Sequence, residues 1–307
     1  MITDRPEQLL AALIVEAALG YPKRLFHPVT GAGWLIAKLD RQWNTGNHRR
    51  ILGVLVAITL ITLGVGAGFA IEHIATGWTG SIIVIFVATT GLAQRSLYDH
   101  VRAVAEPLAA GNLETARDAV AMIVGRDTAA LDASGIASAA TETLAESFCD
   151  GVVAPAFWFL ILGLPGLFAF KAISTADSMI GHLDDRYRDF GWASARIDDA
   201  MNWIPARIAG VLICIAGGRG WRMMWRDAAK HLSPNSGWPE SAMAGALGVQ
   251  LGGGAAYDGE WIARAHLGDG TRPLPTDLSR AIGIYCRACL ALWLVMGLIA
   301  GLIIWLL

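Results

Sequence analysis

The chain has 307 residues, of which 54% are hydrophobic and only 16% are charged, and its mean hydropathy is +0.47. Soluble domains usually carry about a quarter charged residues, so the composition indicates a membrane protein. A soluble protein with a large core is the alternative, but such a core would not need the long uncharged runs of this sequence. The formal net charge of −2 argues against a nucleic-acid partner.

The first apolar segment, Leu9 to Gly20, contains Glu16 and is shorter than the roughly 20 residues that span a bilayer. We expect a retained helix that is tilted, shallow or re-entrant, because the segment lacks the basic flank and cleavage site of a signal peptide. The prolines and glycines of "GYPKRLFHPVTGAGW" then predict an ordered loop that carries Lys23, Arg24 and His27.

Two firmer spans follow, Ile51 to Ala75 and Thr79 to Ala93. From about residue 94 to residue 150 the sequence is amphipathic, with apolar residues at helical spacing. Asn112 and Asp127 stand where N-caps would begin new helices. We therefore predict a helical insert of about three helices that lie outside the bilayer or against its surface.

The next apolar segment, Val152 to Ile173, is interrupted by "GLPG", which predicts either a kinked span or a hairpin that re-enters the membrane. Ala200 to Gly217 is a further apolar segment that contains Pro205. A polar loop over about residues 218 to 280 follows, and Ala288 to Leu307 forms the last predicted span.

Lysine and arginine concentrate before Ile51 and in the polar loop, so the positive-inside rule places both regions in the cytoplasm. If 152–173 crosses the membrane once, alternation puts the charged segment 174–199 on the far side, and broken helices that line a polar cavity would resolve this conflict. We predict an all-α, polytopic integral membrane protein with roughly five to seven membrane segments, and with amphipathic helices and long polar loops outside the bilayer. Residues 1–307 are expected to form a single membrane-embedded domain.

The first candidate site is a set of carboxylates, Glu142, Glu146 and Asp150, spaced four residues apart. This spacing puts all three on one face of a helix, where like charges repel. A magnesium ion with phosphate oxygens would compensate the repulsion, because magnesium binds one or two carboxylates plus substrate phosphates. A charged face that is simply solvated is the alternative.

The second candidate site lies in the charged segment between two apolar stretches, where ionisable groups are costly unless they are paired or used. Its candidate residues are Asp177, Arg196, Asp198, Asp199, Asn202 and Arg207. The arginines could bind phosphate or carboxylate in bidentate fashion. An ion pair between Asp199 and Arg207, with side chains that extend to the membrane interface, is the alternative.

The third candidate site is "HLSPNSGWPE", in which Pro239 suits the first turn of a helix. Exposed amide groups beside Ser233, Asn235 and Ser236 would form an anion site at the start of that helix. A simple turn and helix cap is the alternative, and turn propensity alone favours it.

Two further features carry less information. The glycine-rich "LGGGAAYDGE", which contains Tyr257, could approach a ligand closely. His27 could act as an acid or base near neutral pH, although a histidine in a proline-bounded loop more often forms local hydrogen bonds. The sequence has no G-x-x-x-x-G-K-[ST] motif, so a nucleotide would not be held by a P-loop.

Five sequence blocks occur in order along most of the chain: "GYPKRLFHPV", "ESFCDGVVAPAF", "STADSMIGHLDDRYRDFGWASARIDDAMNWIPAR", "SPNSGWPE" and "LGGGAAYDGE". Together they resemble the adenosylcobinamide-phosphate synthase family, the CobD/CbiB membrane proteins of cobalamin biosynthesis. The sequence departs from the family pattern at Tyr21, where an aspartate is usual, and at Ser174 and Ala176, where asparagine and leucine are usual.

The resemblance implies a multi-pass enzyme of the bacterial inner membrane. It would join the carboxylate of adenosylcobyric acid to the amine of aminopropanol phosphate, or of ethanolamine phosphate or another threonine-derived amine, to give adenosylcobinamide phosphate. ATP and Mg²⁺ are the expected cofactors, because a carboxylate is a poor acyl donor and needs activation, most simply as an acyl phosphate. The implied partners are these small molecules and the lipid bilayer, and a homo-oligomer or a complex with other cobalamin-assembly enzymes remains open.

The resemblance also distributes roles among the candidate residues. Glu142, Glu146 and Asp150 are expected to bind Mg-ATP, and Arg196 and Arg207 to bind phosphate or a corrin carboxylate. The remaining catalytic candidates, Asp177, Asp198 and Asp199, would position the amine and substrate together with Asn202. The other predicted substrate-binding residues are His27, Ser233, Asn235, Ser236, Glu240 and Tyr257.

A non-catalytic membrane protein, either a transporter or a corrinoid-handling component, is the chief alternative. In such a protein the charges would line a path for the substrate. Transporters usually show an internal repeat, and none is visible in the sequence.

Overall fold

The computed structural model describes residues 4–21, 27–257 and 259–306. Lys23 and Arg24, which the sequence places in a basic loop, lie outside these described residues. Within them, five helical runs are long and apolar enough to cross a membrane: Gly46–Ile74, Gly77–Ala109, Ala133–Leu162, Trp192–Gly217 and Pro275–Leu306. The prediction of an all-α, polytopic membrane protein is confirmed.

The chain divides into two compact units whose segments alternate along the sequence. Unit 1 comprises Met1–Ala93, Ala154–Asn202 and Met296–Leu307, and unit 2 comprises Gln94–Val153 and Trp203–Val295. The predicted helical insert coincides with the first segment of unit 2, and the predicted polar loop lies within its second segment.

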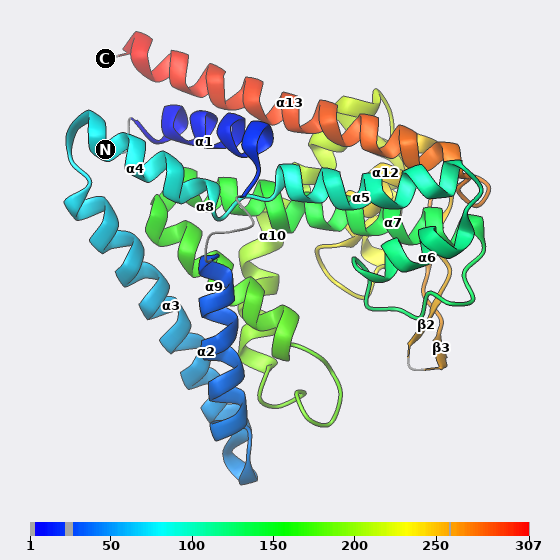
Figure 1. Ribbon diagram of the computed structural model, residues 1–307, viewed down its shortest axis with the longest axis horizontal. Helices are drawn as coiled ribbons and strands as arrows, with labels where there is room; N and C mark the ends of the chain where they lie inside the picture. Colours follow the sequence, from blue (N-terminus) through cyan, green and yellow to red (C-terminus); the bar gives the residue numbers. More distant parts are fainter. Residues whose placement is uncertain (1–3, 22–26, 258, 307) are drawn as a thin grey trace. The chain divides into compact units, whose positions relative to one another are not determined.

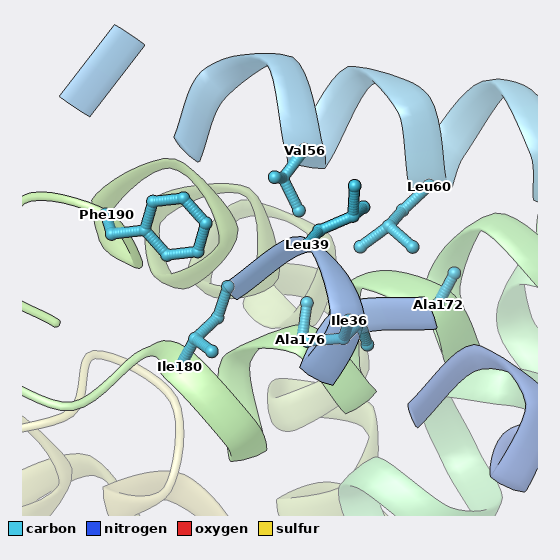
Figure 2. Packing of buried hydrophobic residues seen from close by; sticks show 8 residues of the cluster. All are labelled: Ile36, Leu39, Val56, Leu60, Ala172, Ala176, Ile180 and Phe190. Carbon is cyan, nitrogen blue, oxygen red and sulfur yellow. The ribbon is translucent and has the colours of Figure 1, made fainter. Parts of the chain in front are cut away.

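Unit 1 is built around a pair of long helices, α3 and α9, which pack along each other, with α2 beside them (Figure 1). Its elements are α1 (Arg5–Leu19), α2 (Pro28–Trp43), η1 (Gly46–His48), α3 (Arg49–Ile74), α4 (Gly77–Thr89), α8 (Ala154–Leu162), α9 (Leu164–Ile180) and the first part of α10 (Trp192–Gly217). Figure 2 shows the buried cluster at this junction: Ile36, Leu39, Val56, Leu60, Ala172, Ala176, Ile180 and Phe190. The cluster holds α9 in place, and α9 carries Asp177.

The helix break at Gly163 decides between the two interpretations of "GLPG". Gly163 has a φ of 71°, a conformation that favours glycine, and it separates α8 from α9. The two helices pack against each other, and an added Cβ on Gly166 would lie 2.5 Å from the carbonyl oxygen of Trp158. Glu72 accepts a 2.7 Å hydrogen bond from the amide of Leu164 and so satisfies the start of α9. The segment is therefore a helical hairpin and not one kinked span.

Unit 2 places α7 between α5 and α12, and α5 and α7 run side by side in Figure 1. Its elements are α5 (Gln94–Ala109), α6 (Leu113–Ala121), α7 (Ala133–Phe148), η2 (Cys149–Val153), α11 (Trp221–Asp227), η3 (Ala228–Lys230), α12 (Gly237–Leu247), the rest of α10 and most of α13 (Pro275–Leu306). This arrangement brings a helix from the predicted insert against a helix from the predicted polar loop.

One of the two predicted helix caps is confirmed and one is wrong. Asn112 caps α6, because its side chain accepts a 3.2 Å hydrogen bond from the amide of Thr115. Asp127 begins no helix; it accepts a 2.8 Å hydrogen bond from the amide of Gly259. The cap of α7 is Asp132, which accepts a 2.7 Å bond from Gly135. Aspartate is a favoured N-cap residue, so residue type does not distinguish Asp127 from Asp132. The path of the chain decides which of them begins a helix.

The predicted polar loop is largely structured. It contains α11, η3 and α12, and also two small antiparallel ribbons that the sequence analysis did not predict. Their strands are β1 (Leu251–Gly252) with β4 (His266–Leu267), and β2 (Ala255–Tyr257) with β3 (Glu260–Ile262). The three consecutive glycines 252–254 all have positive φ, between 76° and 121°, which explains this glycine-rich stretch.

Candidate functional site

The carboxylates of α7 face the region around α12 and β1 in unit 2. Glu142 and Glu146 follow the predicted spacing of four along α7. The α-helix ends at Phe148, and Asp150 falls in η2, a single turn of π-helix, where five residues separate hydrogen-bonded groups. The predicted ladder is therefore interrupted before its third member, and the spacing of four no longer fixes where Asp150 lies relative to Glu142 and Glu146.

Glu142 is held by three partners and is nearly buried. Its Oε1 accepts a 2.8 Å bond from the Ser138 hydroxyl and a 3.1 Å bond from the amide of Gly252. Its Oε2 forms an ion pair with Arg126, whose side chain is only 11% exposed. Because these groups occupy both oxygens, Glu142 ties α7 to β1 and to the segment before Asp127.

Glu146 is exposed, and the hydroxyl of Ser236 donates a 2.8 Å hydrogen bond to it. Ser236 belongs to a tight turn in which the hydroxyl of Ser233 accepts the amides of Asn235 and Ser236, each at 3.2 Å. These amides are thus bonded within the turn, as the turn-and-cap interpretation of the third site predicts. The turn therefore holds the exposed carboxylate of Glu146, and this carboxylate is the group that a ligand could contact here.

Glu240, on α12, is buried, and His231 lies beside it. Burial, together with the nearby charges of Glu142 and Glu146, raises the pKa of Glu240 well above its ordinary value. Burial lowers the pKa of His231. The Nδ1 atom of His231 accepts the amide of Ser233 at 3.0 Å, so the neutral ring carries its proton on Nε2, which lies 3.6 Å from Oε1 of Glu240.

A tyrosine at the end of β2 and an arginine between β3 and β4 lie near the same group. Arg264 donates a hydrogen bond to the hydroxyl of Tyr257, and its guanidinium also lies over the tyrosine ring, 5.4 Å from the centroid. A cavity of about 100 Å³ opens beside Arg264 and His231, and Lys230 also lines it. The positive side chains make this cavity suitable for an anion.

Arg207 is stacked between two tryptophans. Its guanidinium lies 4.6 Å from the ring centroid of Trp203 and 4.5 Å from that of Trp238. It donates a 3.0 Å hydrogen bond to Oδ1 of Asn235. The alternative of an Asp199–Arg207 ion pair is wrong, because Asp199 pairs with Arg196 at 3.4 Å. Within the described residues Arg207 has no carboxylate within 4.0 Å, so its charge is available to a ligand.

The acids of unit 1 form a second group, around Asp198 on α10. Asn202 donates a 3.0 Å hydrogen bond to Oδ2 of Asp198. In the part of the chain that the structure describes, the buried Oδ1 of Asp198 has no hydrogen-bond partner. Asp177 and Lys171, both on α9, lie within electrostatic reach of this carboxylate. A positively charged group of a substrate would satisfy the open oxygen.

His27 has a local structural role in unit 1. Its Nδ1 accepts a 3.2 Å hydrogen bond from the amide of Val29, which caps α2. Burial and, to a smaller extent, the charge of Lys171 lower the pKa of His27. This bond is the local contact expected of a histidine in a proline-bounded loop, and a role of His27 in substrate binding stays a prediction.

Comparisons with known proteins show the family of the chain. A family model described as "CobD/Cbib protein" matches residues 9–285. The chain is 49% identical over 305 residues to a "Cobalamin biosynthesis protein CobD" of Rhodobacter capsulatus, covering 96% of this chain and 97% of that protein. Proteins of the same name from Brucella suis and Halalkalibacterium halodurans are 42% and 41% identical, over 96% and 99% of this chain and 95% and 99% of their own lengths. The chain belongs to the CobD/CbiB family. No solved structure matches it.

The CobD/CbiB chain distributes its predicted site residues over both units. Unit 2 holds Glu142, Glu146, Asp150, Arg207, Ser233, Asn235, Ser236, Glu240 and Tyr257, and unit 1 holds His27, Asp177, Arg196, Asp198, Asp199 and Asn202. Among the described residues, no three or more His, Cys, Asp or Glu side chains group closely enough to hold a metal ion by themselves.

Sequence reasoning missed four charged members of these two groups: Arg126, Lys171, His231 and Arg264. Lys171 carried a usable signal, because it is the only ionisable residue within the apolar stretch "GLPGLFAFKAIS". His231 is the first residue of "HLSPNSGWPE", the third candidate site. Arg126 and Arg264 lie in polar segments, where a single arginine has no distinguishing pattern, and only the tertiary contacts reveal them.

Proposed function

We propose that this CobD/CbiB protein acts in cobalamin biosynthesis as an adenosylcobinamide-phosphate synthase. It would join the carboxylate of adenosylcobyric acid to the amine of aminopropanol phosphate, or of a related phosphorylated amine, with consumption of ATP. The bacterial inner membrane is its proposed location. The observation that carries the proposal is the group in unit 2 that combines an exposed carboxylate, Glu146, with the cationic side chains Arg207 and Arg264.

The chemistry explains why such groups are needed. A carboxylate is unreactive toward amines in water, so one of its oxygens must first take a phosphoryl group and become a leaving group. The amine nitrogen then attacks the acyl carbon, the C–O bond breaks, and phosphate leaves. Arginines would favour these reaction steps, because their planar, charged guanidinium groups bind phosphoryl oxygens.

Magnesium fits the residues of unit 2 only in part. The ion prefers one or two carboxylates plus substrate phosphates, so a closed cluster of protein ligands is not required. We assign Glu146 and Asp150 to this role. Glu142 is engaged by Arg126, Ser138 and Gly252, and we therefore give it a structural role instead. When bound, magnesium would neutralise the charge of the transferred phosphoryl group.

We assign recognition of the substrate amine to unit 1. An ammonium group needs acceptors, and the buried Oδ1 of Asp198 is one that the described residues leave open. Asn202 fixes the other oxygen of this carboxylate. Arg196 forms an ion pair with Asp199, and we therefore assign the amine to Asp198.

The experiment is a reconstitution with purified full-length protein, adenosylcobyric acid, aminopropanol phosphate and Mg-ATP, with mass spectrometry of the corrinoid product. The proposal expects the amide product and a stoichiometric loss of ATP. The same protein in sealed vesicles tests the transporter alternative. Movement of corrinoid across the bilayer without formation of the amide would overturn the proposed enzyme function and support the transporter alternative.

A further inference from the structure

A second basic cavity lies in unit 2, away from the carboxylates of α7. It has a volume of about 250 Å³. Three arginines line it, Arg219, Arg280 and Arg287, together with Gly217, Ala246, Gly283 and Ile284. The cavity lies where α10 ends and where α13 begins, and both helices are candidate membrane spans.

Backbone carbonyls hold the three guanidinium groups in place. Arg219 donates from Nε and Nη2 to the carbonyls of Ala246 and Leu247, at 2.9 and 2.8 Å. Arg280 donates to the same Leu247 carbonyl at 3.1 Å, and Arg287 donates from Nε to Ala216 at 2.9 Å. These carbonyls belong to the last turns of α12 and α10, where cations are favourable. The arginines are therefore fixed before any ligand arrives.

Capping alone does not account for this arrangement. Each guanidinium has five N–H donors, and the hydrogen bonds described for Arg219 and Arg287 use two and one of them. Among the described residues, a single carboxylate partners this group of three arginines. It is that of Asp277, which lies 2.6 Å from Arg280. Three cations around one open cavity repel each other, and an anion in the cavity would remove that repulsion.

The surroundings indicate what kind of anion this is. Directly after Arg287 the sequence becomes the apolar run that starts at Ala288, so this arginine stands at the border of a membrane span. Trp221 and Trp225 on α11 are 42% and 67% exposed, as expected for side chains at the level of the lipid head groups. Basic pockets between membrane helices at this depth bind lipid phosphates.

We propose that this cavity binds a phosphate group, that of an anionic phospholipid head group. Arg219 and Arg287 donate to the phosphate oxygens, and Arg280 supplies charge while it remains paired with Asp277. An added Cβ on Gly217 would lie 2.6 Å from the Cβ of Ala246, so this glycine lets α10 pack closely on α12, while the absence of a side chain at Gly283 leaves room on α13. A soluble phosphate shares this chemistry, and the experiment separates the two sources.

The first arm uses full-length protein in nanodiscs that contain equal amounts of phosphatidylcholine and phosphatidylglycerol, with native mass spectrometry of the retained lipid. We expect wild type to retain phosphatidylglycerol in preference to phosphatidylcholine. Arg219→Gln/Arg287→Gln should lower that preference about thirtyfold, the loss expected for two arginines at an anionic membrane surface. The matched control, Arg188→Gln/Arg272→Gln, removes two exposed arginines that do not line the cavity and should keep the wild-type preference.

Gly283→Leu is a second variant that leaves every charge in place. An added Cβ there would meet nothing nearer than Nη1 of Arg287 at 3.6 Å, so the helix tolerates it while the rest of the side chain fills the cavity. It should lose the lipid preference as well. This variant decides the question if the double arginine variant does not fold.

The second arm measures the melting temperature of delipidated protein with inorganic phosphate. Stabilisation of wild type but not of Gly283→Leu, without a lipid preference, would keep the phosphate site and make its ligand soluble. The proposal is overturned if neither phosphate nor phosphatidylglycerol distinguishes wild type from Gly283→Leu, or if the control variant loses the lipid preference to the same extent.

Discussion

The hydroxyl of Ser236 donates a 2.8 Å hydrogen bond to Oε1 of Glu146, a residue 90 positions earlier in the chain. This bond joins the turn before α12 to the exposed face of α7. It leaves the second carboxylate oxygen of Glu146 for another partner, and it fixes the orientation of the side chain. The bond therefore connects two sequence blocks that showed no relation in the sequence.

Glu146→Gln should lower kcat about a hundredfold or more, because under the proposed function it removes a carboxylate that would hold magnesium at the transferred phosphoryl group. Since Glu146 is exposed, the melting temperature should stay close to that of wild type. The decisive readout is the magnesium concentration for half-maximal rate, which should rise if Glu146 binds the ion. Glu106→Gln, in an exposed pair on α5, is the control and should change neither quantity.

Ser236→Ala should also lower kcat and raise the magnesium requirement, but by less than Glu146→Gln does. A hydrogen bond to a charged group contributes about 1.5–3 kcal/mol, so we expect roughly a tenfold or greater loss of rate. Ser236 acts as a positioning residue, and Ser236→Thr, which keeps the hydroxyl, should recover much of the activity. A normal magnesium requirement and rate in Ser236→Ala would remove the bond from the mechanism.

The ion pair of Arg126 with Glu142 should be important for stability. Both side chains are nearly buried, at 11% and 5% exposure, so Arg126→Met leaves an uncompensated charge and should cost about 3–5 kcal/mol of unfolding free energy. The double variant Arg126→Met/Glu142→Met should recover a large part of that loss. Denaturant titration in mixed micelles measures both. Arg95→Met, which breaks a half-exposed pair with Asp99, should cost about 1 kcal/mol or less.

Glu240 should make stability depend on pH. Its pKa is raised in the folded protein, so the stability it contributes is fully present below its ordinary pKa of 4.5 and is lost as the pH rises through the folded value. Glu240→Gln cannot ionise, so at pH 8 its free energy of unfolding should exceed that of wild type by about 1.4 kcal/mol for each unit of pKa shift. Its melting temperature should therefore be higher. The two proteins should converge toward pH 4.5. Equal melting temperatures at all pH values would mean that Glu240 is ionised in the fold.

Arg207→Lys should separate charge from geometry. Lysine keeps the positive charge, but it cannot stack as a plane between Trp203 and Trp238 or offer two parallel donors. We expect the KM of the phosphorylated amine or of ATP to rise about tenfold with a smaller change in kcat. Arg222→Lys, on the surface of α11, serves as the matched control. A variant with unchanged KM for both substrates would exclude Arg207 from phosphate binding.

Asp198→Asn should weaken binding of the amine. Asparagine can still accept the hydrogen bond from Asn202, so the fold should persist, while the open oxygen loses its charge. The KM of the amine should increase by about tenfold or more, the effect of removing one charged hydrogen bond. Asp189→Asn, on the exposed loop beside Arg49, is the control. An unchanged KM in Asp198→Asn would place amine recognition elsewhere.

The membrane architecture could be predicted from the sequence because hydropathy is a local property. Each long apolar run that was predicted as a span became a helix, and α6 begins at the predicted cap Asn112. The choice between a kinked span and a hairpin at "GLPG" depended on the backbone of Gly163 and on how closely α8 approaches α9. Neither quantity follows from composition.

The candidate site was predicted only in part. The carboxylates of α7 were found because a spacing of four has a fixed meaning on a helix. The partners of those carboxylates come from distant segments: Gly252 from a strand of a ribbon and Ser236 from a turn. The pairing of Arg207 was missed because the nearest charge along the sequence, Asp199, is not its neighbour in the fold. Helical periodicity identifies a face, and tertiary packing decides what meets it.

The π-turn at Cys149–Val153 accommodates one residue more than a regular turn. An extra residue in an ordinary α-helix would rotate everything that follows by about 100° about the axis. The wide turn takes up this rotation, so the apolar faces of α7 and α8, on either side of it, each keep their own direction. Asp150 belongs to this wide turn, so its position around the helix axis is set by the turn and not by the spacing of four that places Glu142 and Glu146.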